Sequence, residues 1–404
     1  MSILSFFEKE KEEVSLLIDI GNGTIQAGLA SFSKGKLPKF LYTVKLPFPV
    51  LGAPDIKRLS TDLSTLLDSV LTAVVKEGLS NLYKKNKKLR HTLITFSSPW
   101  FISKTKQIHI SKARAFYITE WLMQSISQKE EEFFRSELLK DLPTGATDSF
   151  EVIEKSIVEA KVNGYLLDNS VGQKTKTLDV SVCMSAISKS IKEKIEGLIL
   201  KHLNISKEQI LMHTFPLVLF STVRDHLQVD QNFILMDITS EITDITLVLD
   251  GAIFGSASFP SGRNLILRQI SKSFNTSAEI AESTLHMYQS KKTTPPVTES
   301  INQIFMDIEK EWIVYFDNML QELSPNAILP KKLYVTADND VASIFIDFLK
   351  SSEGDFTSVF KKTGVLTHID QELLRPFYQE NPVVKTDQFI IILALFYNKV
   401  FQTN

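Results

Sequence analysis

The chain has 404 residues, of which 43% are hydrophobic and 23% charged, and its formal net charge is -2. This length predicts at least two lobes of an ordinary globular protein, and the near-neutral charge gives no reason to expect a nucleic-acid partner. The one cysteine, Cys183, excludes an internal disulfide and a cysteine-clustered zinc site, and is typical of a reducing cytoplasm. The longest apolar run, Phe389 to Phe396, is far shorter than the roughly 18 residues of a membrane-spanning helix.

Residues 2–13 predict a short amphipathic helix at the beginning of the chain, with no secretory signal. The next segment, Val14 to Phe32, is the most informative stretch. An apolar run ends in an acidic residue, a loop with two glycines follows, and a second alternating run leaves the loop. The acidic and loop residues are Asp19, Gly21, Asn22, Gly23 and Thr24. The glycines let backbone N–H groups approach a phosphate, the threonine adds a hydroxyl donor, and the aspartate is placed to hold a hydrated Mg²⁺.

The following segments alternate between strand and helix patterns. A third strand is predicted over 40–47 and a helix over 57–80, and the basic cluster from Lys84 to Arg90 is typical of a solvated loop. A strand over 91–97 opens a new unit, which continues with a helix over 119–139 and strands over 150–162 and 178–186. We interpret residues 91–186 as a strand–helix–strand–strand module inserted into the first lobe.

Residues 232–260 repeat the pattern of the opening segment. A strand ends at Asp237, the loop Thr239-Ser240-Glu241 follows, and two further strands flank the turn Asp250-Gly251. The first copy runs from Asp19 to Pro47 and the second from Asp237 to Pro260. Two such meanders indicate a duplicated domain whose halves face each other across a cleft.

The rest of the chain predicts mainly helices. They cover 188–203, a segment from Thr214, 264–290, 299–323, 340–350 and a buried tail at 386–401, with a strand at 331–336. The predicted organisation is a first lobe at 1–90 and 187–230, the inserted module at 91–186, and a second lobe at 231–404 with a helical insertion at about 264–325.

Other nucleotide and metal motifs do not fit. A dinucleotide fingerprint requires a third glycine where Gln26 stands, and it requires a helix where Thr24 to Phe32 alternates as a strand. The sequence has no GxxxxGK[ST], HExxH or GxSxG run, and the 7 histidines lack metal-ligand spacing. Only the duplicated aspartate loops predict a ligand site.

These loops carry a resemblance. The segments IDIGNGTIQAG, MDITSEITDITLVLDGAIFGSASFPSGRN, AEIAES and LYVTADND together resemble the actin-like ATPase superfamily, specifically its bacterial FtsA/PilM branch. The resemblance implies an α/β, ribonuclease H-like duplicated two-lobe fold. FtsA-like members link the cell-division ring to the membrane, and PilM-like members form a cytoplasmic platform of the type IV pilus machinery.

The resemblance also implies a nucleotide site. The two aspartate loops would hold the phosphates of ATP, and Asp19 and Asp237 would bind Mg²⁺ through water. A turn after the third strand lies near the phosphates, and a helix and a late turn hold the adenosine. The positions implied in the second half are Asp237, Thr239, Ser240, Gly262, Arg263, Glu279, Glu282, Thr336 and Ala337.

Several of these positions depart from the family pattern. Thr239, Ser240 and Glu241 replace a glycine-rich loop, Arg263 replaces a glycine, and Ala337-Asp338 replaces a late glycine pair. Side chains restrict the backbone that wraps a phosphate. Glu241, if it pointed into the cleft, would oppose a triphosphate by about 1 kcal/mol or more. We therefore expect binding of ATP and Mg²⁺ to be weak or absent, and hydrolysis to be still less favoured.

The sequence thus predicts a cytoplasmic adaptor with a degenerate nucleotide cleft, recruited to the inner face of the membrane by a protein partner. That partner would be a short peptide of a membrane protein, as for PilM-like members, or a division-ring protein; a second copy of the chain is another candidate. The chain ends without the linker and amphipathic anchor of FtsA-like members, which favours the PilM-like role. Two alternatives stay open: an active, polymerising ATPase of cell division, and a small-molecule kinase of the same superfamily.

Overall fold

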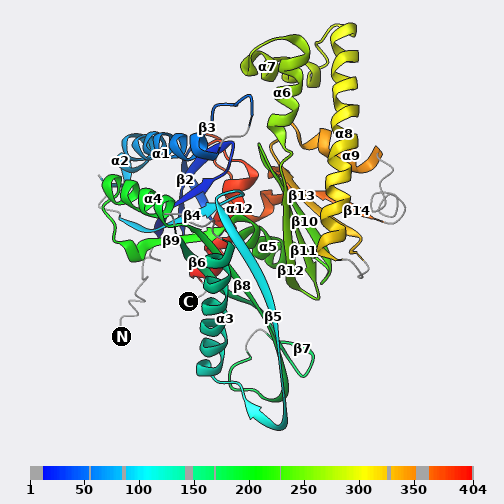
Figure 1. Ribbon diagram of the computed structural model, residues 1–404. Coiled ribbons are helices and arrows are strands. Elements are labelled where there is room, and N and C mark those ends of the chain that lie inside the picture. The colour runs from blue at the N-terminus through cyan, green and yellow to red at the C-terminus, as the bar shows by residue number, and fades with distance from the viewer. Residues whose placement is uncertain are drawn as a thin grey trace, which may run out of the picture.

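The computed structural model describes residues 12–53, 56–83, 88–141, 149–167, 170–227, 229–324, 329–351 and 364–402. Two five-stranded sheets form the two lobes, and a four-stranded sheet projects away from them (Figure 1). Most of the predicted N-terminal helix, and Lys84, Lys85 and Lys87 of the basic cluster, lie outside the described residues. None of the described helices is long and apolar enough to cross a membrane.

The first sheet has the order β3-β2-β1-β4-β9. Its strands are β1 (Glu13–Ile20), β2 (Thr24–Phe32), β3 (Lys39–Pro47), β4 (Leu89–Phe96) and β9 (Ile210–Thr214). The first three strands form an antiparallel meander, and β4 and β9 add to it in parallel. The helices α1 (Ile56–Ala73) and α4 (Lys189–His202) pack on one face. A π-helical turn, Val74–Leu79, and the short α2 (Ser80–Tyr83) continue α1.

The second sheet has the equivalent order β12-β11-β10-β13-β14. Its strands are β10 (Phe233–Ile238), β11 (Thr243–Leu249), β12 (Ala252–Phe259), β13 (Lys332–Ala337) and β14 (Val365–His368). The helices α6 (Arg263–Phe274), α7 (Ala278–Gln289), α8 (Pro295–Leu323) and α9 (Ala342–Ser351) cover one face. Both meanders are followed by parallel strands in the same arrangement, so the predicted duplication is confirmed.

Two helices fill the space between the sheets. α5 (Phe215–His226) and α12 (Gln388–Gln402) share one buried cluster with residues of both sheets. α12 packs against β1, β2, β4 and α5, and a Cβ on Gly28 of β2 would lie 2.8 Å from Ile390. The tail is a buried helix, as predicted. It packs on the first sheet, however, and the prediction that placed all of 231–404 in the second lobe is corrected here, because its apolar residues cover the sheet face that α1 and α4 leave open.

The projecting sheet contains the inserted module, in the order β5-β8-β6-β7. It consists of β5 (Phe101–Tyr117), α3 (Glu120–Asp141), β6 (Phe150–Val162), β7 (Tyr165–Leu166) and β8 (Lys174–Ser188). α3 packs on one face of this sheet. The predicted first strand, 91–97, is instead β4 of the first lobe, because its apolar residues are buried beside β1. The module starts at β5, a strand that was not predicted because the sequence of 101–117 is largely charged and polar.

Glu154 of β6 anchors the module to the first lobe. This side chain is only 2% exposed, and its Oε2 accepts hydrogen bonds from Thr214 Oγ1 at 2.8 Å and Ser185 Oγ at 3.0 Å. His213 Nδ1 lies 2.7 Å from the other carboxylate oxygen. The module also reaches the second lobe, where Lys161 Nζ lies 3.6 Å from Asp250 Oδ2. It therefore contacts both halves of the cleft.

Two predicted helices have different limits. The helix expected over 264–290 is divided into α6 and α7 at Asn275, whose φ of 50° ends the first helix, and Ser277 caps the second. α8 begins at Pro295, earlier than the expected 299, because proline is compatible with the first turn of a helix.

Replacing Tyr397 by phenylalanine tests the packing of α12 on the first sheet. The Tyr397 hydroxyl accepts a hydrogen bond from Ser15 Oγ at 2.8 Å and lies 2.7 Å from His91 Nδ1. We expect Tyr397→Phe to lower the free energy of unfolding by about 1–2 kcal/mol, because the buried Ser15 and the partly buried His91 each lose a hydrogen bond. Urea unfolding measures the change. Tyr315→Phe, on an exposed tyrosine of α8, is the control and should change stability much less; equal effects would contradict this account.

Candidate functional site

The two predicted phosphate loops contact each other directly through one side chain. Asn22, in the β1–β2 loop, is 1% exposed. Its Nδ2 donates to Thr239 Oγ1 in the β10–β11 loop at 2.7 Å and to the carbonyl oxygen of Ser98 at 2.7 Å, and its Oδ1 accepts from Glu241 N at 2.9 Å. Asn22 thus bridges the two lobes at the position where the resemblance implies phosphate.

Two glycines allow this close approach. A Cβ on Gly23 would lie 1.6 Å from Ser240 Oγ, and a Cβ on Gly262 would lie 2.2 Å from the Thr239 carbonyl oxygen. The first backbone N–H groups of α6 are also engaged, since Arg263 N donates to Thr239 O at 3.1 Å and Asn264 N to Ser240 O at 2.7 Å. Gly23 and Gly262 therefore allow close contacts with the Thr239-Ser240 loop, whereas the sequence predicted a close approach to phosphate.

The space left between the loops is small. A cavity of about 20 Å³ is lined by Asp19, both loops, Ser97, Asp338 and Phe389. This volume holds about one water molecule. Mg²⁺ usually keeps several waters and binds with the substrate phosphates, and such a group does not fit here. The structure brings the predicted loop residues together, but in a closed arrangement.

Asp19 and Asp237 occupy equivalent ends of β1 and β10. Thr95 Oγ1 donates to Asp19 at 2.9 Å, and Thr336 Oγ1 donates to Asp237 at 2.8 Å. Burial raises the pKa of Asp19 to about 7, against the opposing hydrogen bond from Thr95. Burial, and then the neighbouring Asp244 carboxylate, raise the pKa of Asp237 well above its ordinary value. Burial thus shifts the protonation equilibrium of both aspartates toward the uncharged form.

Ser98 and Asp244 make a second contact between the lobes. Ser98 Oγ donates to Asp244 Oδ1 at 2.6 Å, and Ser258 Oγ donates to the same oxygen at 2.5 Å. Both Ser98 and Asp244 are buried. The sequence analysis missed this pair. In the sequence, the pair is indicated only by Asp244, an acidic residue in a strand with alternating apolar residues, and this does not identify Ser98 as its partner.

Lys45 makes a third contact, at the outer side of the loops. This residue of β3 places its Nζ 3.0 Å from Asp338 Oδ1, after β13, and 3.0 Å from Asp387 Oδ2, before α12. Burial lowers the pKa of Lys45, but the two carboxylates raise it by more, so the ammonium stays charged. The ion pair with Asp338 connects the first meander to the end of the second sheet, and the ion pair with Asp387 connects it to the beginning of α12.

A larger hollow of about 520 Å³ adjoins these contacts, and the three residues of the Lys45 contact are part of its lining. Its lining includes Gly23, Thr24, Ser240 and the predicted nucleoside-binding residues Glu279 and Glu282. The lining contains more carboxylates than basic groups. The acidic residues are Glu279, Glu282, Asp338, Asp340 and Asp387, and the basic residues are Lys45 and Arg263. The volume is sufficient for a small molecule, but this charge balance disfavours a triphosphate.

Glu241 does not point into the cleft. Its carboxylate accepts hydrogen bonds from Arg268 Nη1 at 2.9 and 3.0 Å and from Asn264 Nδ2 at 2.7 Å, both on α6. The predicted repulsion of a phosphate by an inward Glu241 is therefore corrected. An arginine and an amide on the adjacent helix neutralise and orient this carboxylate.

Two other residues that were predicted to bind the nucleoside, Thr336 and Ala337, are not among the residues that line the hollow. Ala337 is fully buried, and its carbonyl oxygen accepts a hydrogen bond from Gln388 Nε2 at 2.5 Å. The Thr336 hydroxyl is engaged with Asp237. Asp338, the next residue, lines the hollow instead.

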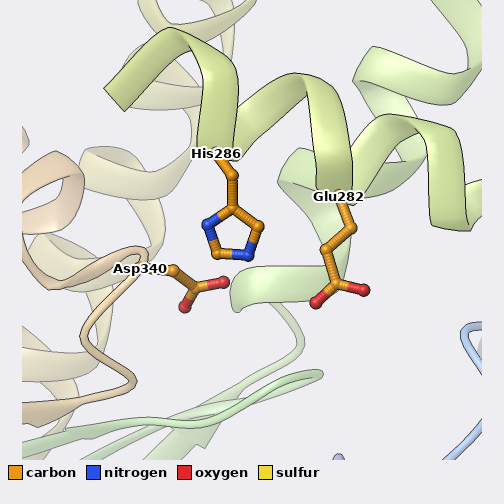
Figure 2. Close-up of side chains that lie close together, drawn as sticks. All are labelled: Glu282, His286 and Asp340. Carbon is orange, nitrogen blue, oxygen red and sulfur yellow. The ribbon is translucent and has the colours of Figure 1, made fainter. Parts of the chain in front are cut away.

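An acidic cluster borders the hollow (Figure 2). Glu282 and His286, one turn apart on α7, and Asp340 place one ligand atom each within 4.8 Å of one another, and His286 lies between the two carboxylates. Arg263 Nε donates to Asp340 Oδ2 at 2.7 Å, and its Nη2 donates to Glu282. The Arg263 guanidinium thus already binds two of the three members. The cluster connects α6, α7 and the segment after β13, and the sequence analysis did not predict it.

Comparison with solved structures decides the fold. The PilM–PilN type IV pilus biogenesis complex aligns with 96% of this chain and 98% of the solved chain, with a TM-score of 0.56 and 13% identity. This chain has an actin-like ATPase fold. A Bacteroides thetaiotaomicron protein, described as having an actin-like ATPase fold and unknown function, aligns over 98% of the chain with a TM-score of 0.43 and 10% identity. The likeness to the solved PilM–PilN complex confirms the predicted fold.

Comparison of amino-acid sequences matches a smaller part of this chain than comparison of structures. No protein-family model matches it. The cell division protein FtsA of Neisseria meningitidis serogroup B is 26% identical over 135 residues. This match spans 32% of the chain and about a third, 32%, of that relative.

The pH dependence of stability tests the buried state of Asp19. Between its ordinary pKa of 3.8 and its folded pKa of about 7, the folded protein holds a proton that the unfolded chain has lost. Stability contributed by this group is therefore lost as the pH rises through that window. Asp19→Asn removes the proton equilibrium and keeps an oxygen acceptor for Thr95. We expect its stability relative to the wild type to rise by roughly 1.4 kcal/mol or less per pH unit between pH 4 and 7.

Urea unfolding at pH 5 and pH 7.5 provides the measurement. Asp307→Asn, on the exposed side of α8, serves as the control and should follow the wild-type pH profile. Parallel profiles for Asp19→Asn and the wild type would show that Asp19 does not have a raised pKa.

Proposed function

We propose that this protein is a cytoplasmic actin-like adaptor with a degenerate nucleotide cleft, acting through protein contacts in a membrane-associated assembly. The observation that carries the proposal is the Asn22 bridge, which places a side chain of one lobe against the phosphate loop of the other. The cavity left between the two loops, about 20 Å³, is too small for a triphosphate with hydrated Mg²⁺, which supports this proposal. The proposed activity therefore includes no step through ATP.

Opening the cleft would break several contacts at once. The three cross-lobe contacts described above, centred on Asn22, Ser98 and Lys45, would all be lost. A buried neutral hydrogen bond contributes about 1 kcal/mol, and one with a charged partner about 1.5–3 kcal/mol. Any ligand that needs the open form binds more weakly, in proportion to the fraction of molecules that are open. This cost supports weak or absent nucleotide binding.

The position of the module and the likeness to PilM both support the proposal that the protein acts through a protein partner. The module touches both lobes yet extends away from them, so it offers a surface that a partner can reach without entering the cleft (Figure 1). PilM is found in a complex with PilN, a second pilus biogenesis protein. We favour a pilus-type role over a division role, because the PilM likeness extends along 96% of the chain and the FtsA match along 32%.

Titration with Mg-ATP by calorimetry tests the closed cleft. We expect no measurable binding by the wild type at micromolar concentrations. Asn22→Ala combined with Ser240→Gly removes the bridge and the hydroxyl that fills the space next to Gly23. This double variant should bind Mg-ATP at least tenfold more tightly than the wild type, because the cost of opening is reduced. Replacement of Glu241 is unnecessary, since that carboxylate binds Arg268.

The control is Asn302→Ala with Ser283→Gly, two exposed positions on α8 and α7, which should leave the result unchanged. Tight binding by the wild type would contradict the degenerate site. Release of phosphate by the wild type well above background would favour the active ATPase instead of the adaptor.

A further inference from the structure

The far end of the module carries an uncommon group of exposed side chains, which we call the module tip. It comprises Lys112, Arg114, Tyr117, Trp121, Lys174 and Lys176. These residues come from the end of β5, the first turn of α3 and the beginning of β8. Figure 1 shows this end of β5 and α3 at the side of the module away from both lobes.

Hydrogen bonds hold the segments of the module tip together. Ile118 N, between β5 and α3, donates to Gln173 O at 2.9 Å, and Gly172 N donates to Ile118 O at 2.7 Å. Tyr117 pairs with Lys174 across the antiparallel strands, and Lys174 Nζ lies 5.6 Å from the centre of the Tyr117 ring. The aromatic and basic side chains therefore share a defined end of the sheet.

The basic residues of the module tip have no carboxylate partner among the described residues. Lysines of the same strand nearer the lobes behave differently: Lys104 Nζ lies 2.8 Å from Glu137, and Lys106 Nζ lies 2.8 Å from Glu130. The structure gives Lys112, Arg114, Lys174 and Lys176 no such ion pair within the part of the chain that it describes. Glu120 is the acidic residue adjacent to Trp121. The module tip is thus a concentrated positive charge in a protein whose formal net charge is -2.

Its aromatic residues are exposed to an unusual degree. Trp121 is 74% exposed and Tyr117 61% exposed, whereas Trp100 and Trp312, the other two tryptophans of the chain, are 4% and 0% exposed. Exposed Trp and Tyr beside Lys and Arg match the chemistry of a membrane–water interface, where aromatic rings lie at the headgroup level and basic groups meet anionic headgroups.

We propose that the module tip binds the surface of an anionic lipid membrane, with Trp121 and Tyr117 at the headgroup level. The charge of the tip is complementary to such a surface, and the projection of the module lets it touch a surface while both lobes stay clear. An acidic peptide is less favoured, because the rings lie on a projecting end. The proposal does not depend on whether the cleft binds nucleotide.

The experiment uses the full chain and vesicles of phosphatidylcholine with 30% phosphatidylglycerol, compared with phosphatidylcholine alone. Co-sedimentation measures binding, and tryptophan fluorescence measures contact by Trp121, since the other two tryptophans are buried. We expect binding to the anionic vesicles at 0.1 M salt, a blue shift of the emission that Trp121→Phe abolishes, and weaker binding at 0.5 M salt.

A charge variant tests the basic residues. We expect Lys112→Ala, Arg114→Ala, Lys174→Ala and Lys176→Ala together to weaken vesicle binding at least tenfold, because each basic group near the surface contributes about fivefold. All four side chains are exposed, so the fold should be retained. The control variant replaces four exposed lysines outside the module by alanine, which gives the same change in net charge. These are Lys34, Lys36, Lys272 and Lys292.

The control should bind vesicles within twofold of the wild type. The proposal is overturned if the wild type does not bind the anionic vesicles, or if both quadruple variants lose binding equally. Binding of the module tip to a polyglutamate peptide without binding to vesicles would also overturn it and would assign the tip to an acidic protein partner.

Discussion

The hydrogen bonds of one buried side chain, Asn22, determine the state of the central cleft. A primary amide can donate and accept at once, and Asn22 uses both capacities across the lobes, toward Thr239 and the backbone N–H of Glu241. Gly23 and Gly262 let the loops come close enough for this geometry. The ion pairs of Lys45 and the Ser98–Asp244 bond then close the cleft on either side. In a low-dielectric interior, these hydrogen bonds and ion pairs stabilise one arrangement of the two lobes.

The duplicated topology explains why these contacts can form. The central strand of each sheet, β1 or β10, carries an aspartate next to its last residue. This aspartate accepts a hydrogen bond from a threonine on the neighbouring parallel strand, Thr95 for Asp19 and Thr336 for Asp237. Two equivalent edges therefore face each other with similar loops. α5 and α12 fill the space between the sheets and fix the distance between those edges. This frame holds the two loops against each other.

The sequence predicted the features that depend on local patterns. Alternation over Val14 to Phe32 and over 232–260 predicted both meanders, since period-2 patterning is a direct consequence of strand geometry. β5 was missed because its residues are largely polar and charged, and an exposed edge strand needs no apolar alternation. The orientation of Glu241 and the partners of Asn22 and Lys45 could not be predicted, because each depends on residues far away in sequence. The packing of α12 on the first sheet is likewise a long-range property, which the largely apolar sequence of the helix does not specify alone.

Hydrogen–deuterium exchange of the backbone amide of Glu241 tests the central claim most directly, since this N–H donates to Asn22 across the cleft. The account predicts slow exchange in the wild type, unchanged by saturating Mg-ATP, and faster exchange in Asn22→Ala. Fast exchange at Glu241 in the wild type, or a change in its exchange when Mg-ATP is added, would show that the cleft opens to nucleotide and would contradict the account.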